Sequence, residues 1–123
     1  MSSLFSYDLN NVIADRKIIV VVCSGGFTSS MMAQRMQKYM DELGKPYYVM
    51  YASIQALIEP DFLELYAKNI SLVFISPQVN HYYEEAREQM TGYEVPVLKI
   101  ESRVFGTMDY ENLVNTALQT LSS

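Results

Sequence analysis

The only cysteine of the 123-residue chain, Cys23, stands where a thiol can act as a nucleophile. It follows an apolar, β-branched run, and a helical pattern begins a few residues later. A strand, a glycine-containing loop and a helix N-terminus in succession present backbone N–H groups and the positive end of a helix dipole to an anion. The same surroundings favour the thiolate, which is the reactive form of cysteine. The segment therefore predicts a nucleophilic thiol beside a phosphate-binding loop.

The residues after Cys23 indicate how such a loop holds phosphate. Gly25 and Gly26 permit a sharp turn and a close approach of the backbone, and the hydroxyls that follow can cap the helix. The expected phosphate-binding residues are Ser24, Gly25, Gly26, Phe27, Thr28, Ser29 and Ser30. No Gly-Lys-Ser/Thr ends the loop, as it would in a Walker motif. Ser29 stands where a cysteine phosphatase would place its arginine. We therefore expect one phosphoryl group, held without a strong clamp.

Composition limits the classes of function. The net charge is −5 and the nine Lys and Arg are scattered, so we expect no nucleic-acid partner. No apolar run is long enough to span a membrane, and residues 1–15 lack the features of a signal peptide. One cysteine permits no internal disulfide, so we expect a cytoplasmic protein. We expect no cofactor and no metal, and a monomer. Residues 1–16 are interpreted as an N-terminal extension, and residues 17–123 as a single domain.

Apolar runs alternate with helical patterns along this domain. The predicted strands are 17–23, 47–52, 71–75 and 95–100. The predicted helices are 28–43, 53–58, 60–66, 80–90 and a last helix capped by Asp109, with a loop over 102–108. This alternation predicts an α/β fold, namely an open parallel sheet with helices on both faces. We expect its four strands to lie in the order 2-1-3-4, as in flavodoxin-like and P-loop-like folds. Pro96 near the start of its strand indicates a sheet edge.

Periodicity predicts which helix faces are buried. In the first helix the buried stripe is expected to be Met32, Met36, Tyr39, Met40 and Leu43. The charged residues of segment 80–90 are expected to face solvent.

Ligands of open parallel sheets bind beyond the carboxyl ends of the strands. Segments 23–30, 76–81 and 102–108 meet there in the predicted fold. If the third strand lies beside the first, Pro77 and Gln78 lie close to the cysteine loop. His81 lies on the same edge, and we interpret it as a partly exposed residue at a helix start, in preference to a base or second phosphate carrier.

Three segments, in order and with matching spacing, resemble the enzyme IIB components of the sugar phosphotransferase system, lactose/cellobiose/chitobiose type. Residues 23–32 (CSGGFTSSMM) resemble the family's Cys-Ser-Ala-Gly-Met-Ser-Thr-Ser-Leu-Leu loop. Residues 75–79 (ISPQV) resemble its strand followed by Gly-Pro-Gln-Ile, and residues 105–109 (FGTMD) resemble its Tyr-Gly-x-x-Asp-Gly. The resemblance extends over about residues 17 to 121. Tyr110 stands where the family often has glycine, and His81 stands near a place where it often has tyrosine.

The resemblance implies that Cys23 is phosphorylated. It implies that the phosphate comes from a histidine of a IIA component and passes to a disaccharide held by the membrane IIC component, so that the chain is peripherally associated with that permease. Two other hypotheses remain open. One is a low-molecular-weight cysteine phosphatase or arsenate-reductase-like enzyme, against which Ser29 argues. The other is a non-catalytic regulatory domain with the same fold. A lone cysteine at a strand end is also often only a small buried residue.

Overall fold

The computed structural model describes residues 17–23, 27–57 and 69–121, with backbone alone for residues 27–29 and 56–57. The strands are β1 (Lys17–Cys23), β2 (Tyr47–Ser53), β3 (Ile70–Ile75) and β4 (Val97–Lys99). The helical elements are α2 (Phe27–Glu42), α3 (Ile54–Leu57), the 3-10 helix η2 (Pro77–Tyr82), α5 (Tyr83–Thr91), α6 (Ser102–Gly106) and α7 (Tyr110–Leu121). The expected extension over residues 1–16 and the expected helix over 60–66 lie outside the described residues.

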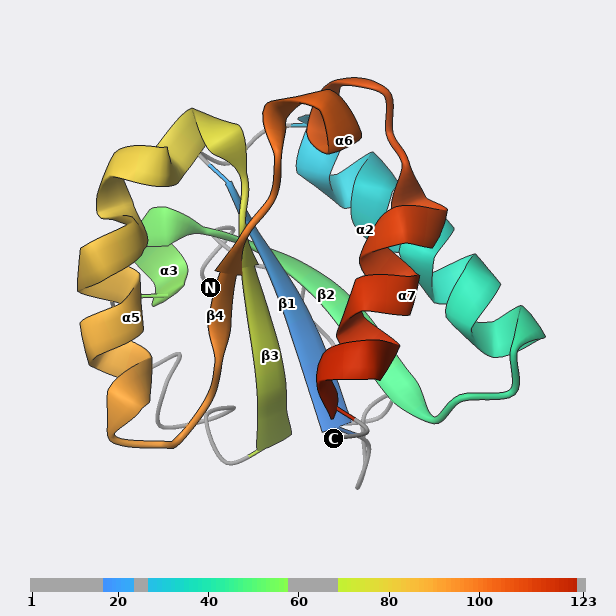
Figure 1. Cartoon of the computed structure of the whole chain (residues 1–123), viewed down its shortest axis with the longest axis horizontal. Coiled ribbons are helices and arrows are strands. Elements are labelled where there is room, and N and C mark those ends of the chain that lie inside the picture. Colours follow the sequence, from blue (N-terminus) through green and yellow to red (C-terminus); the bar gives the residue numbers. More distant parts are fainter. Residues whose placement is uncertain (1–16, 24–26, 58–68, 122–123) are drawn as a thin grey trace.

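The four strands form one parallel sheet of order β2-β1-β3-β4, which confirms the predicted topology (Figure 1). β1 therefore lies inside the sheet, and its apolar run is buried from Ile18 onward. The β-branched residues of such a run suit a strand that is covered on both faces. β4, which follows Pro96, is an edge strand as expected.

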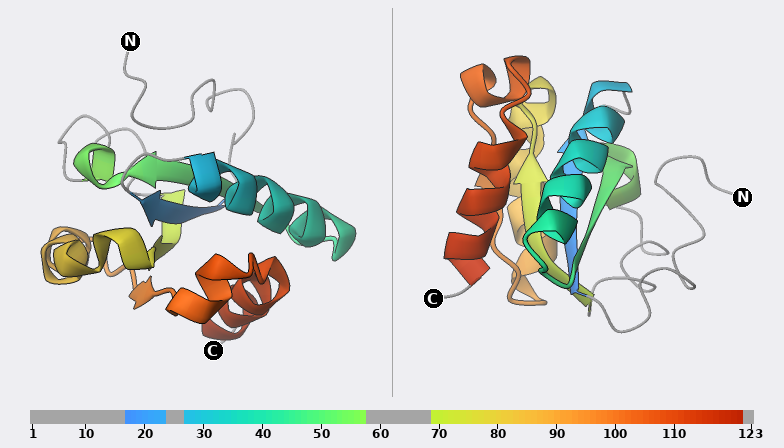
Figure 2. Two further views of the ribbon diagram at one scale, coloured as in Figure 1. Left: turned by 90° about the horizontal axis from the view of Figure 1, so that it is seen from above. Right: turned by 90° about the vertical axis from the view of Figure 1, so that its right-hand side faces the viewer.

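Helices cover both faces of the sheet, so two separate cores form (Figure 2). Successive side chains of a strand point to opposite faces. Accordingly Val20 and Val22 of β1 pack in the core beneath α3 and α5, whereas Ile19 and Val21 pack in the core beneath α2, α6 and α7. The second core includes residues from all three of those helices, with Met36, Phe105 and Val114 among them.

Side chains from helices satisfy backbone groups of both edge strands. Gln37 of α2 accepts a hydrogen bond from the Val49 N–H (2.8 Å) and donates one to the Tyr47 carbonyl (3.1 Å) on β2. At the opposite edge, the Tyr83 hydroxyl donates to the Val97 carbonyl (3.2 Å) on β4. Unpaired backbone groups at a sheet edge invite pairing with another chain, and these contacts cover part of each edge.

Segment 102–108, expected to be a loop, contains the short helix α6 instead. Val104 and Phe105 of α6 are both buried, and Glu101 at its N-cap is extended. A helix of five residues is too short to show a period in the sequence, and it forms because its apolar pair packs against the second core. The loop prediction was therefore wrong.

Two further boundaries differ from expectation. The helix predicted over 80–90 is preceded by η2, which starts at Pro77, and α5 itself starts at Tyr83. Proline suits a first helical position because it has no N–H to leave unpaired. The strand predicted over 95–100 is confined to residues 97–99, since pairing with β3 begins at Val97.

The buried stripe of α2 is confirmed at its methionines, and Tyr39 is half-buried. Leu43 is 41% exposed and does not belong to it, because the helix ends at Glu42 and the chain then turns away through Gly44. The four charged residues of α5 are exposed as expected: Glu84, Glu85, Arg87 and Glu88.

Candidate functional site

Cys23 is the last residue of β1 and lies at the carboxyl edge of the sheet. It pairs in register with Ser53, the last residue of β2. On its other side, the Ser76 N–H donates to the Val22 carbonyl (2.9 Å), so the β1–β3 ladder continues past Ile75. The backbone of the cysteine is therefore held between two neighbouring strands in the interior of the sheet, which fixes its position.

Three small polar side chains lie on one face along this edge. Each of them stands two residues after a side chain that packs in the core beneath α2, α6 and α7. These core side chains are Tyr51 on β2, Val21 on β1 and Phe74 on β3. Because strand side chains alternate, Ser53, Cys23 and Ser76 face the same side. Ser53 is 3%, Cys23 1% and Ser76 0% exposed, so this row of side chains is buried.

The start of α2 lies close to the cysteine by chain connectivity. Four peptide links separate Cys23 from Phe27, the first residue of α2, so their Cα atoms lie within about 15 Å of each other. The first turn of α2 contains no acidic residue to compete with an anion at its positive end. Ser30, in that turn, is half-buried. Of the other expected phosphate-binding residues, Ser24, Gly25 and Gly26 lie outside the described residues, as do the side chains of Phe27, Thr28 and Ser29.

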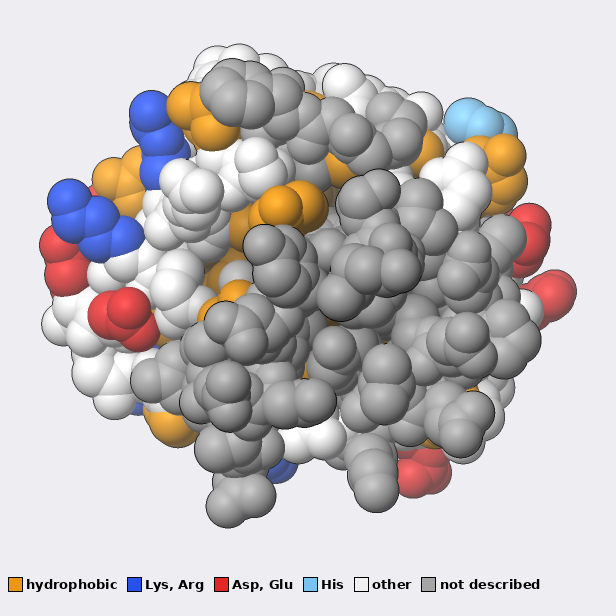
Figure 3. All heavy atoms as spheres, turned by 180° about the vertical axis from the view of Figure 1, so that it is seen from behind, with side chains coloured by type: hydrophobic (Ala, Val, Ile, Leu, Met, Phe, Trp, Pro, Cys, Tyr) orange, Lys and Arg blue, Asp and Glu red, His pale blue; other side chains and the backbone are white. Residues whose placement is uncertain are grey.

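The segment after β3 lies beside the end of β1. The Ser76–Val22 hydrogen bond brings the chain before Pro77 next to Cys23, and η2 contacts β1. Pro77 is half-buried and Gln78 is exposed. His81, at the far end of η2, is exposed, and its ring contacts that of Tyr82 with centroids 4.4 Å apart. Seen from behind, the histidine lies at the rim of the molecule next to hydrophobic side chains, and acidic side chains lie further along the same rim (Figure 3).

Ser53 and Ser76 were not singled out as site residues from the sequence. Each follows an uninterrupted apolar run that predicts a strand, and a small polar residue at the carboxyl end of a parallel strand is a signal that points to the ligand edge. Reading the ends of all the strands together, and not the cysteine loop alone, would have found both.

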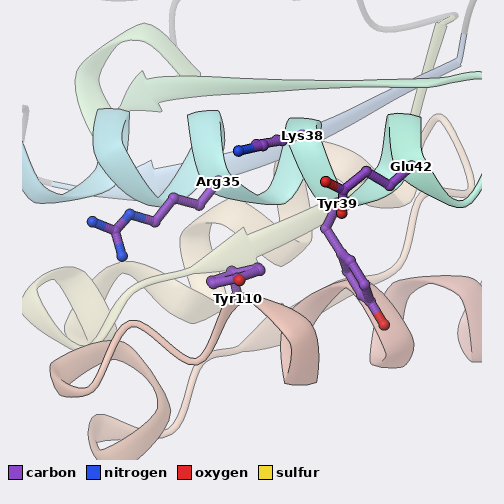
Figure 4. Close-up of a pocket in the computed structure, with 5 residues that line it drawn as sticks. All are labelled: Arg35, Lys38, Tyr39, Glu42 and Tyr110. Carbon is purple, nitrogen blue, oxygen red and sulfur yellow. The ribbon is translucent and has the colours of Figure 1, made fainter.

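A pocket of about 260 Å³ lies elsewhere, between α2 and α7 (Figure 4). Its lining residues are Arg35, Lys38, Tyr39, Glu42 and Tyr110. Arg35 lies more than two turns along α2 from Phe27, so this pocket is not part of the cysteine edge. Within the described part of the chain, no three His, Cys, Asp or Glu residues are placed to hold a metal ion together. None of the described helices has the length and apolar character needed to cross a membrane.

Comparisons with known proteins agree with this fold. The family model described as "PTS system, Lactose/Cellobiose specific IIB subunit" matches residues 18–116, which include Cys23 and all of the described strands except Lys17 at the start of β1. The chain therefore belongs to the lactose/cellobiose-specific IIB family of the phosphotransferase system, and it is a phosphotransferase component of sugar transport. Among curated proteins, none matches the sequence.

Solved structures share the fold, among them two IIB components. The lactose-specific IIB component domain from Streptococcus pneumoniae has a TM-score of 0.70 at 14% identity, over 85% of this chain and 96% of that one. The cellobiose-specific phosphotransferase IIB component from Borrelia burgdorferi has a TM-score of 0.66 at 20% identity, over 87% of this chain and 93% of that one.

Proposed function

We propose that Cys23 carries the phosphoryl group, receiving it from a phosphohistidine of a IIA component and passing it to a β-linked disaccharide held by a membrane IIC permease. The disaccharide is of the cellobiose, lactose or chitobiose class. The observation that carries this proposal is the position of the only cysteine, which ends the inner strand β1 at the carboxyl edge, directly before α2, in a chain of the IIB family.

The phosphoryl group is transferred in two steps, first to Cys23 and then to the sugar. In the first, an electron pair of the Cys23 thiolate forms an S–P bond while the P–N bond of the phosphohistidine breaks, and its electron pair returns to the imidazole. In the second, a sugar hydroxyl oxygen attacks phosphorus, the S–P bond breaks and the thiolate leaves, while the hydroxyl proton passes to a base. Such transfers depend on positioning and charge stabilisation. The positive end of α2 supplies part of that stabilisation.

Two features of the site suit a carrier. Ser29 stands where a phosphatase would place an arginine, and a carrier that must release its phosphate is served by a weaker clamp. The first turn of α2 also contains no acidic residue, so no carboxylate of that turn repels a phosphoryl group on Cys23. Delivery to a membrane permease would place the protein at the cytoplasmic side of the membrane, docked in turn on IIA and IIC.

The proposal is tested by relay to sugar in a reconstituted system of phosphoenolpyruvate, enzyme I, HPr, IIA and IIC membranes. Cys23→Ser is expected to abolish sugar phosphorylation while its circular dichroism and unfolding curve remain those of a folded protein. A Cys23→Ser protein that still relays phosphate to sugar would overturn the proposal. Release of free phosphate from an aryl phosphate ester by the wild-type protein would instead support the phosphatase hypothesis.

A further inference from the structure

Ser76 carries a buried hydroxyl that is not satisfied. The residue is 0% exposed, and its Oγ has no hydrogen-bond partner among the described residues. Serine at a helix N-cap ordinarily accepts a hydrogen bond from the first turn, yet Ser76 makes no side-chain bond to η2. Buried polar groups are nearly always paired, because an unpaired one loses its bonds to water without replacement. The lone hydroxyl therefore requires an explanation.

The position of the Ser76 hydroxyl beside Cys23 explains why it is unpaired. Ser76 is extended (φ −70°, ψ 158°) and its N–H is bonded to Val22, so it continues the parallel ladder one residue past the Val22–Ile75 pair. The next residue of β1 is Cys23, whose side chain lies on the same face. Neighbouring strands lie about 4.8 Å apart, so Ser76 is next to the cysteine across the sheet.

We infer that the Ser76 hydroxyl donates a hydrogen bond to the phosphoryl group on Cys23, an inference that rests on the proposed function. In the unphosphorylated protein the Ser76 hydroxyl has no hydrogen-bond partner among the described residues, although the Cys23 sulfur is next to it. Phosphorylation of Cys23 adds acceptor oxygens with negative charge beside it, and hydrogen bonds to charged acceptors are the strong ones. The hydroxyl is thus unsatisfied in one state of the carrier and satisfied in the other.

This difference has a thermodynamic consequence. A group that is unpaired in the unphosphorylated protein and paired in the phosphoprotein shifts the transfer equilibrium toward the phosphoprotein. Removing the hydroxyl should therefore have opposite effects on the stability of the two states. The unphosphorylated protein loses an unpaired buried group and is stabilised, whereas the phosphoprotein loses a hydrogen bond and is destabilised. A residue with only a structural role would not show this pattern.

The test compares Ser76→Ala with Ser71→Ala, a serine near the opposite end of β3. Each protein is equilibrated with phosphorylated IIA, and the phosphorylated fraction is measured by intact mass and phosphorus NMR. Ser76→Ala is expected to lower the equilibrium constant for phosphorylation roughly tenfold and to change the phosphocysteine chemical shift, because a charge-assisted bond is lost. Ser76→Thr, which keeps the hydroxyl, is expected to restore both, and Ser71→Ala to change neither.

Urea unfolding of the unphosphorylated proteins completes the test. Ser76→Ala is expected to be as stable as wild type or more stable. Ser76→Gly also removes the hydroxyl, and it takes the place of the alanine variant if that protein does not fold. An unchanged equilibrium constant in a hydroxyl-deleted variant that is phosphorylated on Cys23 would overturn this inference and leave the proposed function intact. A wild-type protein that IIA does not phosphorylate would overturn both.

Discussion

Ser76 and Val22 are joined by a 2.9 Å hydrogen bond from the serine N–H to the valine carbonyl, immediately before Cys23 in the chain. This bond extends the ladder between β1 and β3 to the level of the cysteine, while Ser53 pairs with Cys23 from β2. A nucleophile on such a backbone keeps its position without help from flexible side chains. The sheet therefore positions the sulfur that we propose as the phosphoryl carrier.

The end of α2 depends on a left-handed glycine. Gly44 has φ +71°, and the Lys45 and Gly44 N–H groups donate to the carbonyls of Met40 and Asp41, which is a Schellman motif. A Cβ at Gly44 would meet no atom within 4 Å, so Gly44→Ala tests backbone strain alone. We expect it to lower the free energy of unfolding by about 1–2 kcal/mol, measured in urea.

Gly92 is the matched control for that measurement. It follows α5 with an ordinary φ of −63°, and a Cβ there would also meet no atom within 4 Å. Gly92→Ala is expected to stabilise the protein by about 0.4–1 kcal/mol, because alanine restricts the unfolded chain. Equal effects of the two substitutions would show that the conformation of Gly44 does not matter for stability.

Gln37 holds α2 against the edge strand β2 through its bonds to Val49 and Tyr47. Gln37→Leu keeps much of the volume and removes these bonds, so we expect a loss of about 1–2 kcal/mol in urea unfolding. Gln34, exposed on the same helix, is the control, and Gln34→Leu should change stability by less than about 0.5 kcal/mol. If both variants lose the same stability, the edge contact contributes nothing of its own.

Tyr110 packs edge-on against Tyr39, with ring centroids 6.0 Å apart and planes at 77°. This contact joins α2 to α7. A double-mutant cycle with Tyr39→Leu and Tyr110→Leu is expected to give a coupling free energy of about 0.5–1.5 kcal/mol. Additive single-variant effects would mean that the two rings do not stabilise each other.

The sequence predicted the strands and the burial of the sheet on both faces because long apolar runs and amphipathic helices carry a strong periodic signal. It did not predict α6, where five residues are too few for a period and packing of Val104 and Phe105 decides the structure. It placed Leu43 in the core because periodicity alone does not locate the last residue of a helix. It placed Cys23 at the carboxyl edge, whereas only the structure shows that the Ser76 hydroxyl is buried and has no hydrogen-bond partner among the described residues.

The most direct test of this account is the mass of the protein after incubation with phosphoenolpyruvate, enzyme I, HPr and IIA components of the lactose and cellobiose type. The account predicts one added phosphoryl group, located on Cys23 by phosphorus NMR and absent from Cys23→Ser. A folded, reduced wild-type protein that gains no phosphate from any of these donors, or gains it on another residue, would contradict the account.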